Sequence, residues 1–131
     1  MSSDRGQALI EFALGLPIIL LAAFYAFALI DAATTQEAVD TAARRAVAAI
    51  TGSNDDAQAR GAASATGWLQ GQQIFVTIEP DGSQKRCGGT GVSITVTAPG
   101  HLGFLLPLST SWVARQAATI ENAGPQAGTC P

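Results

Sequence analysis

The stretch ALIEFALGLPIILLAAFYAFALI, residues 8–30, decides how this chain folds, because its 23 residues include one charged side chain, Glu11. As a helix it would be about 34 Å long, which is enough to cross the hydrocarbon of a bilayer with some tilt. An ionised carboxylate in hydrocarbon costs several kcal/mol unless another group pairs with it. The stretch therefore predicts a membrane helix with one charge that needs a partner.

This apolar stretch differs from a conventional secretory signal. Such a signal has a basic leader, an apolar core of about 7–15 residues and a small-residue cleavage site. Here the leader MSSDRG, residues 1–6, is short and the apolar run is longer. We interpret the stretch as a retained anchor, with a conventional cleaved signal as the alternative. Arg5 on one side and Arg44 and Arg45 on the other leave the orientation undecided by the positive-inside rule.

Composition excludes several classes of function. The chain has 131 residues and a net charge of −3, and its seven basic residues are scattered, which argues against nucleic-acid binding. No phosphate-binding glycine loop, paired-carboxylate motif or nucleophile motif occurs, so we expect no enzyme, no cofactor and no metal site. His101, the one histidine, lies in PGHLGFLLPL, residues 99–108, where we expect a solvent-facing loop.

The helical pattern continues beyond Ile30. Apolar residues recur on one face at helical spacing, and they are Val39, Ala42, Ala43, Ala46, Val47 and Ile50. Asp40 and Arg44 form a favourable pair four residues apart. No helix breaker occurs before Thr51-Gly52, so one continuous helix from about residue 8 to 50 is predicted. Its alanine-rich face suits close packing against another helix.

The chain after Gly52 predicts a short helix and then strands. Ser53 followed by Asp56 resembles a capping box, with Asp55-Asp56 at the start of a helix over about 54–69. Apolar residues then alternate with polar ones, and they are Ile74, Val76, Ile78, Val92, Ile94 and Val96. The turn-rich connection PDGSQKRCGGTG, residues 80–91, predicts a hairpin with a long mobile tip, at which Lys85-Arg86 would be solvated.

A third run, SWVARQAATIE at residues 111–121, is predicted as a further strand. The fold class is therefore α+β, with a long N-terminal helix, a short helix and a small antiparallel sheet packed on helix. The apolar run Leu102 to Leu108 could cover the core under the sheet or form an exposed contact surface.

The two cysteines, Cys87 and Cys130, both lie in the polar C-terminal part and have neither metal-site nor redox-motif spacing. One disulfide between them would place this part in an oxidising, non-cytoplasmic compartment. Two free thiols are the alternative.

The stretch GQALIEFALGLP, residues 6–17, resembles the start of TadE-like minor pseudopilins from tight-adherence, type IV-like pilus systems. The resemblance is close over residues 5–50 and looser over 73–121. It implies that a prepilin peptidase cuts between Gly6 and Gln7. It also implies that Glu11 docks on the N-terminal amine of a neighbouring subunit, since a free α-amine has a pKa of about 8 and is mostly cationic at pH 7.

The resemblance divides the chain into a leader over residues 1–6, a transmembrane segment over 7–30, an amphipathic stalk over 31–50 and an extracytoplasmic domain over 51–131. It implies a single-pass protein of the cytoplasmic (inner) membrane with its N-terminus inside, which contributes to an adhesive pilus. The expected partners are the prepilin peptidase, other pilin or pseudopilin subunits, the inner-membrane assembly platform and the lipid bilayer. The alternative is an unprocessed single-pass envelope protein whose domain binds a surface partner.

Two features of the apolar stretch can each be interpreted in more than one way. Glu11 could be protonated, could extend its carboxylate to the membrane edge, or could pair with Arg5. Pro17 lacks an N–H and leaves the carbonyl of Ala13 unpaired, next to Gly15. This segment could loosen when the subunit leaves the lipid, or it could hold a static kink that neighbouring groups tolerate.

Overall fold

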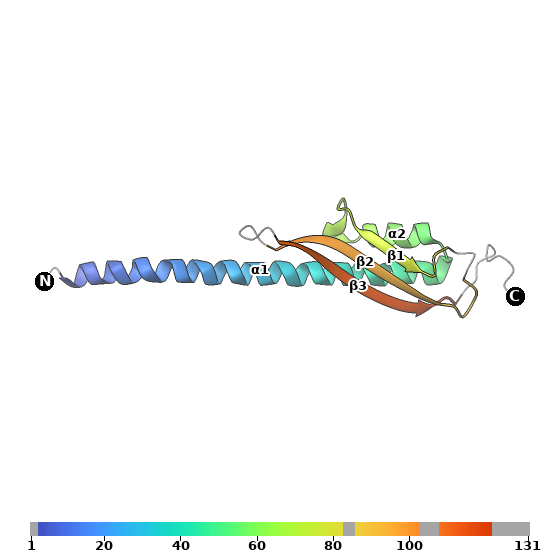
Figure 1. Ribbon diagram of the computed structural model, residues 1–131, viewed down its shortest axis with the longest axis horizontal. Helices are drawn as coiled ribbons and strands as arrows, with labels where there is room; N and C mark the ends of the chain where they lie inside the picture. Colours follow the sequence, from blue (N-terminus) through green and yellow to red (C-terminus); the bar gives the residue numbers. More distant parts are fainter. Residues whose placement is uncertain (1–2, 83–85, 103–107, 122–131) are drawn as a thin grey trace. The chain divides into compact units, whose positions relative to one another are not determined.

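The structure is a computed structural model that describes residues 3–82, 86–102 and 108–121 (Figure 1). Its helices are α1 (Ser3–Ser53), α2 (Asp56–Ser64) and the short 3₁₀ helix η1 (Gly67–Leu69). Its strands are β1 (Phe75–Glu79), β2 (Gly91–Leu102) and β3 (Leu108–Thr119), which form an antiparallel sheet in the order β1-β2-β3. The predicted α+β class, with a long helix, a short helix and a small antiparallel sheet, is confirmed.

The chain divides into two compact units, Met1–Ala33 and Thr34–Pro131. The first contains the apolar part of α1. The second contains the remainder of α1, from Thr34 to Ser53, together with α2 and the sheet. The segment predicted as a stalk over residues 31–50 thus lies largely within the same unit as the strands, because its alanine-rich face supplies part of their core.

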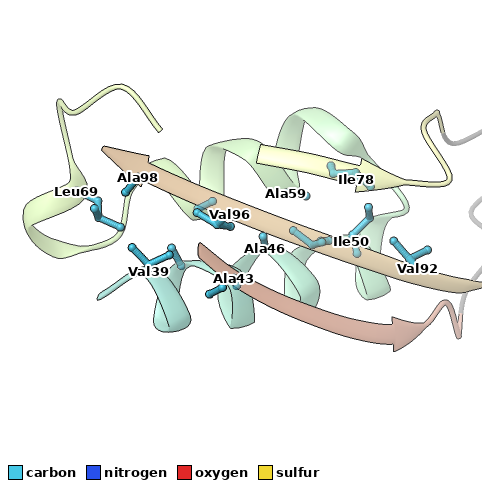
Figure 2. Packing of buried hydrophobic residues seen from close by; sticks show 14 of the residues in the cluster. Val39, Ala43, Ala46, Ile50, Ala59, Leu69, Ile78, Val92, Val96 and Ala98 are labelled. Carbon is cyan, nitrogen blue, oxygen red and sulfur yellow. The ribbon is translucent and has the colours of Figure 1, made fainter. Parts of the chain in front are cut away.

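The core of the second unit lies between this face of α1 and the sheet (Figure 2). Alanines form the middle of this face, and the larger residues Val39 and Ile50 lie at its two ends. α2 adds Ala59 and Ala63 to the same cluster. The predicted apolar face is confirmed, since its members Val39, Ala42, Ala43, Ala46 and Ile50 are fully buried and Val47 packs against them.

The sheet has one face on the helices and one open face. In β2, Val92, Ile94 and Val96 are buried, whereas Ser93 and Thr95 between them are partly exposed. The period of two along the strand therefore places the predicted apolar set on the helix side. Residues that pair across the strands lie on the same face of the sheet. Ile94 pairs with Ile78 of β1 on one side and with Gln116 of β3 on the other, so all three lie on the helix side.

One polar bridge ties α1 to β3. Asp40 pairs through Oδ2 with Arg44 at 2.7 Å, as the four-residue spacing predicted. Its other carboxylate oxygen accepts a hydrogen bond from Nε2 of Gln116 at 2.9 Å. One carboxylate thus satisfies both a neighbour on its own helix and an amide on a strand 76 residues further along the chain.

The junction between α1 and α2 corrects the predicted capping box. α1 runs through Gly52 to Ser53 and ends at Asn54, which has a positive φ of 51°, a conformation that asparagine tolerates better than most residues. The N-cap of α2 is Asp55, whose side chain accepts from the N–H of Ala57 at 2.8 Å. Ser53 instead donates to the carbonyl of Ala49. The helix start at Asp55 is confirmed, and the role given to Ser53 was wrong.

The segment around His101 is a strand rather than the predicted loop. β2 continues to Leu102, with His101 opposite Ser109 of β3. Pro99 does not end the strand. The pairing of β2 with β1 stops at Thr97, opposite Phe75, so from Pro99 onward β2 has a neighbouring strand, β3, on one side only. A proline is tolerated at such an edge position. Residues 103–107 of the apolar run lie outside the described residues.

Gly100 provides a test of the packing between β2 and β3. A Cβ built on Gly100 would overlap the indole of Trp112 on β3, whereas a Cβ on Gly91 of the same strand would meet nothing within 4 Å. We expect Gly100→Ala to lower the free energy of unfolding by about 1–3 kcal/mol, because it overpacks this site. Urea unfolding of the full chain in detergent, followed by tryptophan fluorescence, measures the loss. Gly91→Ala is the matched control, and an equal effect of the two changes would contradict this account.

Candidate functional site on the N-terminal helix

The first unit presents its apolar side chains outward. Within the helix, an 18-residue window has a mean hydropathy of 2.4, and none of that window is buried. The large exposed residues are Leu9, Ile10, Phe12, Leu14, Leu16, Ile18, Ile19, Leu20, Leu21, Phe24, Tyr25, Phe27, Leu29 and Ile30. Soluble proteins rarely expose so much contiguous apolar surface. Of the described helices, this is the one long and apolar enough to cross a membrane.

Glu11 lies on this apolar helix with its side chain exposed. Its neighbours Ile10 and Phe12 are also exposed, at 63% and 66%. No ion pair is formed by Glu11 with any other side chain that the structure describes. The side chain of Arg5 is outside that description, so the local pairing considered from the sequence stays untested.

Gly6 and Gln7 lie one turn before Glu11 and are both exposed within α1. A Cβ built on Gly6 meets nothing within 4 Å. Packing inside this chain therefore gives no reason for a glycine at this position. A requirement for glycine there would come from an outside molecule that approaches the backbone.

Pro17 lies inside α1, and the helix continues through it to Ser53. A proline in a helix leaves the carbonyl four residues earlier without its usual N–H donor, which here is the carbonyl of Ala13. Gly15, between these two residues, has open space where a Cβ would be. The helix turn from Ala13 to Pro17 therefore lacks one backbone hydrogen bond, and its glycine, Gly15, has no neighbouring atoms where a side chain would lie.

A second cluster of polar groups, which was not foreseen from the sequence, centres on Arg86. This arginine was predicted at a solvated hairpin tip, yet its side chain is fully buried. Its Nε donates to the carbonyl of Pro80 at 2.8 Å and its Nη1 donates to Oδ1 of Asn54 at 3.3 Å. Its Nη2 forms an ion pair with Oδ1 of Asp56. The prediction of a solvated Arg86 was wrong, because these three partners replace water around the guanidinium. Lys85 lies outside the described residues.

Asp56 links this arginine to the connection between β1 and β2. While Oδ1 pairs with Arg86, Oδ2 accepts from the N–H of Gly82 at 3.0 Å. Arg60 of α2 also lies 3.9 Å from Asp81, although both side chains are mostly exposed. α2 therefore contacts this connection through residues on both sides of 83–85. A separation of 30 residues between Asp56 and Arg86 explains why no local sequence signal indicated the contact.

Cys87 follows Arg86 directly and is disulfide-bonded. This excludes a free thiol at Cys87. Cys130, the predicted partner, lies outside the described residues, so the pairing of the two stays a prediction. Cys87 is nonetheless held in place, since its N–H donates to Oγ1 of Thr90 at 3.0 Å.

Among the described residues there is no group of three or more histidine, cysteine, aspartate or glutamate side chains that could hold a metal ion. No protein-family model, curated protein or solved structure matches this chain. Its function is therefore inferred from its own residues.

The buried arginine yields a prediction about stability. Arg86→Met keeps most of the length of the side chain but leaves Oδ1 of Asp56 and the carbonyl of Pro80 without the donor that Arg86 provides. We therefore expect a loss of about 2–4 kcal/mol in the free energy of unfolding. Arg115→Met is the matched control, because Arg115 pairs with Glu79 at 3.6 Å with both side chains about two-thirds exposed. We expect it to change stability by about 0.5 kcal/mol or less. Urea unfolding of both variants measures the two effects, and a mild effect of Arg86→Met would refute the role of the cluster.

Proposed function

We propose that this chain is a TadE-like, membrane-inserted subunit of a tight-adherence pilus, processed after Gly6 and assembled with other pilin or pseudopilin subunits. The observation that carries the proposal is the exposed apolar helix with Glu11 as its one charged residue between Gly6 and Ile30. Lipid, and later neighbouring subunits, would cover the apolar side chains. The prepilin peptidase and the inner-membrane assembly platform would be its other partners.

Glu11 acquires a role in this proposal. A cut after Gly6 creates a cationic amine on Gln7, and a carboxylate on a neighbouring copy can pair with it in the apolar environment. Pairing would offset most of the several kcal/mol that an isolated charge costs there. The exposed position of Glu11 and the open surroundings of Gly6 support this role.

The second unit would then lie on the extracytoplasmic side of the inner membrane. The disulfide at Cys87 supports this location, because disulfides persist mainly in oxidising compartments. An unprocessed envelope protein with a partner-binding domain would share the anchor and the disulfide. The two functions differ in what happens at Gly6 and Glu11.

The first test concerns processing. In cells with the native peptidase, we expect the mature chain to begin at Gln7, and we expect Gly6→Val to block the cut because a branched side chain obstructs close approach to the backbone. Intact-mass measurement of the purified protein reads both results. Gly15→Val is the control, since it places the same side chain at another open glycine of α1. Retention of MSSDRG by the whole wild-type population would refute the filament-subunit function.

The second test concerns Glu11. Glu11→Gln keeps the size and the helix propensity of the side chain and removes its charge. We expect membrane insertion to be as good or better, processing to survive and incorporation into sheared extracellular filaments to fall at least about tenfold, equivalent to about 1.4 kcal/mol. Immunoblots of the sheared and membrane fractions measure this ratio, and Glu11→Asp is the control that retains the charge. Normal incorporation of Glu11→Gln would leave an ordinary anchor with a tolerated carboxylate.

A further inference from the structure

A groove of about 450 Å³ lies between α2 and β1, the edge strand beside that helix (Figure 1). Its described lining residues are Arg60, Gly61, Ser64, Ile74, Phe75, Val76 and Thr77. Side chains of consecutive strand residues point alternately to the two faces of a sheet, so a hollow that touches residues 75, 76 and 77 lies along the edge of the strand. None of the described lining residues belongs to β2, so this is the unpaired edge of β1.

The unpaired edge of β1 carries backbone groups that can bind another strand. In an antiparallel ladder, every second residue directs its N–H and C=O towards the neighbouring strand, and the residues between direct theirs away. β1 pairs with β2 from Phe75 to Glu79. Within the described part of the chain, the backbone of β1 makes no hydrogen bond besides this ladder. Such an edge is a template for the addition of a further strand.

The wall that α2 presents to this edge consists of small residues. Gly61 and Ser64 are exposed, and a Cβ built on Gly61 meets nothing within 4 Å. The volume of the groove falls within the range of about 300–1,000 Å³ that is usual for ligand pockets. Residues 74–77 span about 13 Å of strand. These dimensions suit an extended segment of about four residues.

Arg60 gives the groove its charge, since it is the one charged side chain among the described lining residues. It lies 3.9 Å from Asp81, and the two side chains are 54% and 77% exposed. An exposed ion pair of this kind contributes little to stability. A carboxylate on a bound segment can therefore take the place of Asp81 beside the guanidinium, so the complementary ligand is acidic.

We propose that the groove between α2 and β1 binds an extended, acidic segment of a partner protein. The segment would join the sheet as a strand next to β1 and place a carboxylate at Arg60. Main-chain hydrogen bonds to β1 would supply the affinity, and Arg60 would select the acid. This binding needs neither a cut after Gly6 nor a charge at Glu11, so it and the proposed function can fail separately.

Two synthetic hexapeptides with blocked ends serve as probes of strand addition. Both alternate valine and threonine, and a glutamate stands at the amino end of one and at the carboxyl end of the other, which covers both strand directions. Fluorescence anisotropy measures their binding to the full chain in detergent, with empty micelles as background. We expect one peptide to bind, and its backbone N-methylated form to bind at least about tenfold more weakly, because methylation removes the N–H donors. Equal affinity of the methylated form, or no binding at about 1 mM peptide, would overturn the proposal.

Gly61→Leu tests the location of the site. The added side chain would fill the groove without disturbing the fold, because its position is open and leucine is a better helix former than glycine. We expect at least about tenfold lower peptide affinity and no loss of stability in urea. Gly52→Leu adds the same side chain at an exposed glycine of α1 and should bind as the wild type does. Equal affinity of the two variants would refute the site.

Charge exchange at Arg60 tests the choice of an acidic ligand. Arg60→Glu should lower affinity for the glutamate peptide about fivefold, and the same peptide with lysine in place of glutamate should regain it on this variant. Arg115→Glu, at an exposed position of β3, is the control. An unchanged affinity of Arg60→Glu, or no recovery with the lysine peptide, would refute the role of Arg60.

Hydrogen exchange of the complex identifies the strand that the peptide joins. We expect slower amide exchange within residues 75–79 and no change within residues 108–119. Protection of β3 instead would place the peptide on the opposite edge of the sheet and overturn the proposal. Protection of β1 in the chain alone that is lost on dilution would identify a second copy as the occupant and refute a separate partner.

Discussion

The structure depends on close contact between the alanine face of α1 and the sheet. Ala42, Ala43 and Ala46 are fully buried, in one cluster with Ile78 of β1 and Ile94 of β2. Substituting larger residues there would overpack the core. Because α1 supplies this face, the sheet unit has no complete core without the second half of the helix. The same α1 helix that is apolar in its first half therefore also supports the fold of the second unit.

This shared helix has consequences for function. In the proposed pilus subunit, the segment in lipid and the segment under the sheet both belong to α1. Two carboxylates add polar contacts to this apolar core. Asp40 accepts a hydrogen bond from Gln116 of β3, and Asp56 pairs with Arg86 and accepts from the N–H of Gly82. Each joins a helix to a segment far away in sequence. These two carboxylates hold parts of the fold together, whereas the side chain of Glu11 is exposed.

Two exposed apolar surfaces stand out among the described residues. The apolar half of α1 suits lipid or other helices. The open sheet face carries Phe75 and Val113, which are 67% and 50% exposed on either side of Thr97. The first surface belongs to the first unit and the second to the second unit.

The sequence alone determined the periodic elements of this protein. The apolar run predicted the exposed helix, and the spacing of alanines predicted the buried face of α1. The period of two in residues 74–78 and 92–96 predicted the strands and the side of them that faces the core. Only the tertiary structure decided the positions of Arg86 and His101. Arg86 is buried because Asn54, Asp56 and Pro80 surround it, and β2 reaches His101 because β3 pairs with it. Periodicity is a property of residues that are close together in the chain. The burial of Arg86 depends on Asp56, 30 residues away, and the extension of β2 to His101 depends on Ser109, 8 residues away. No local sequence pattern contains these partners.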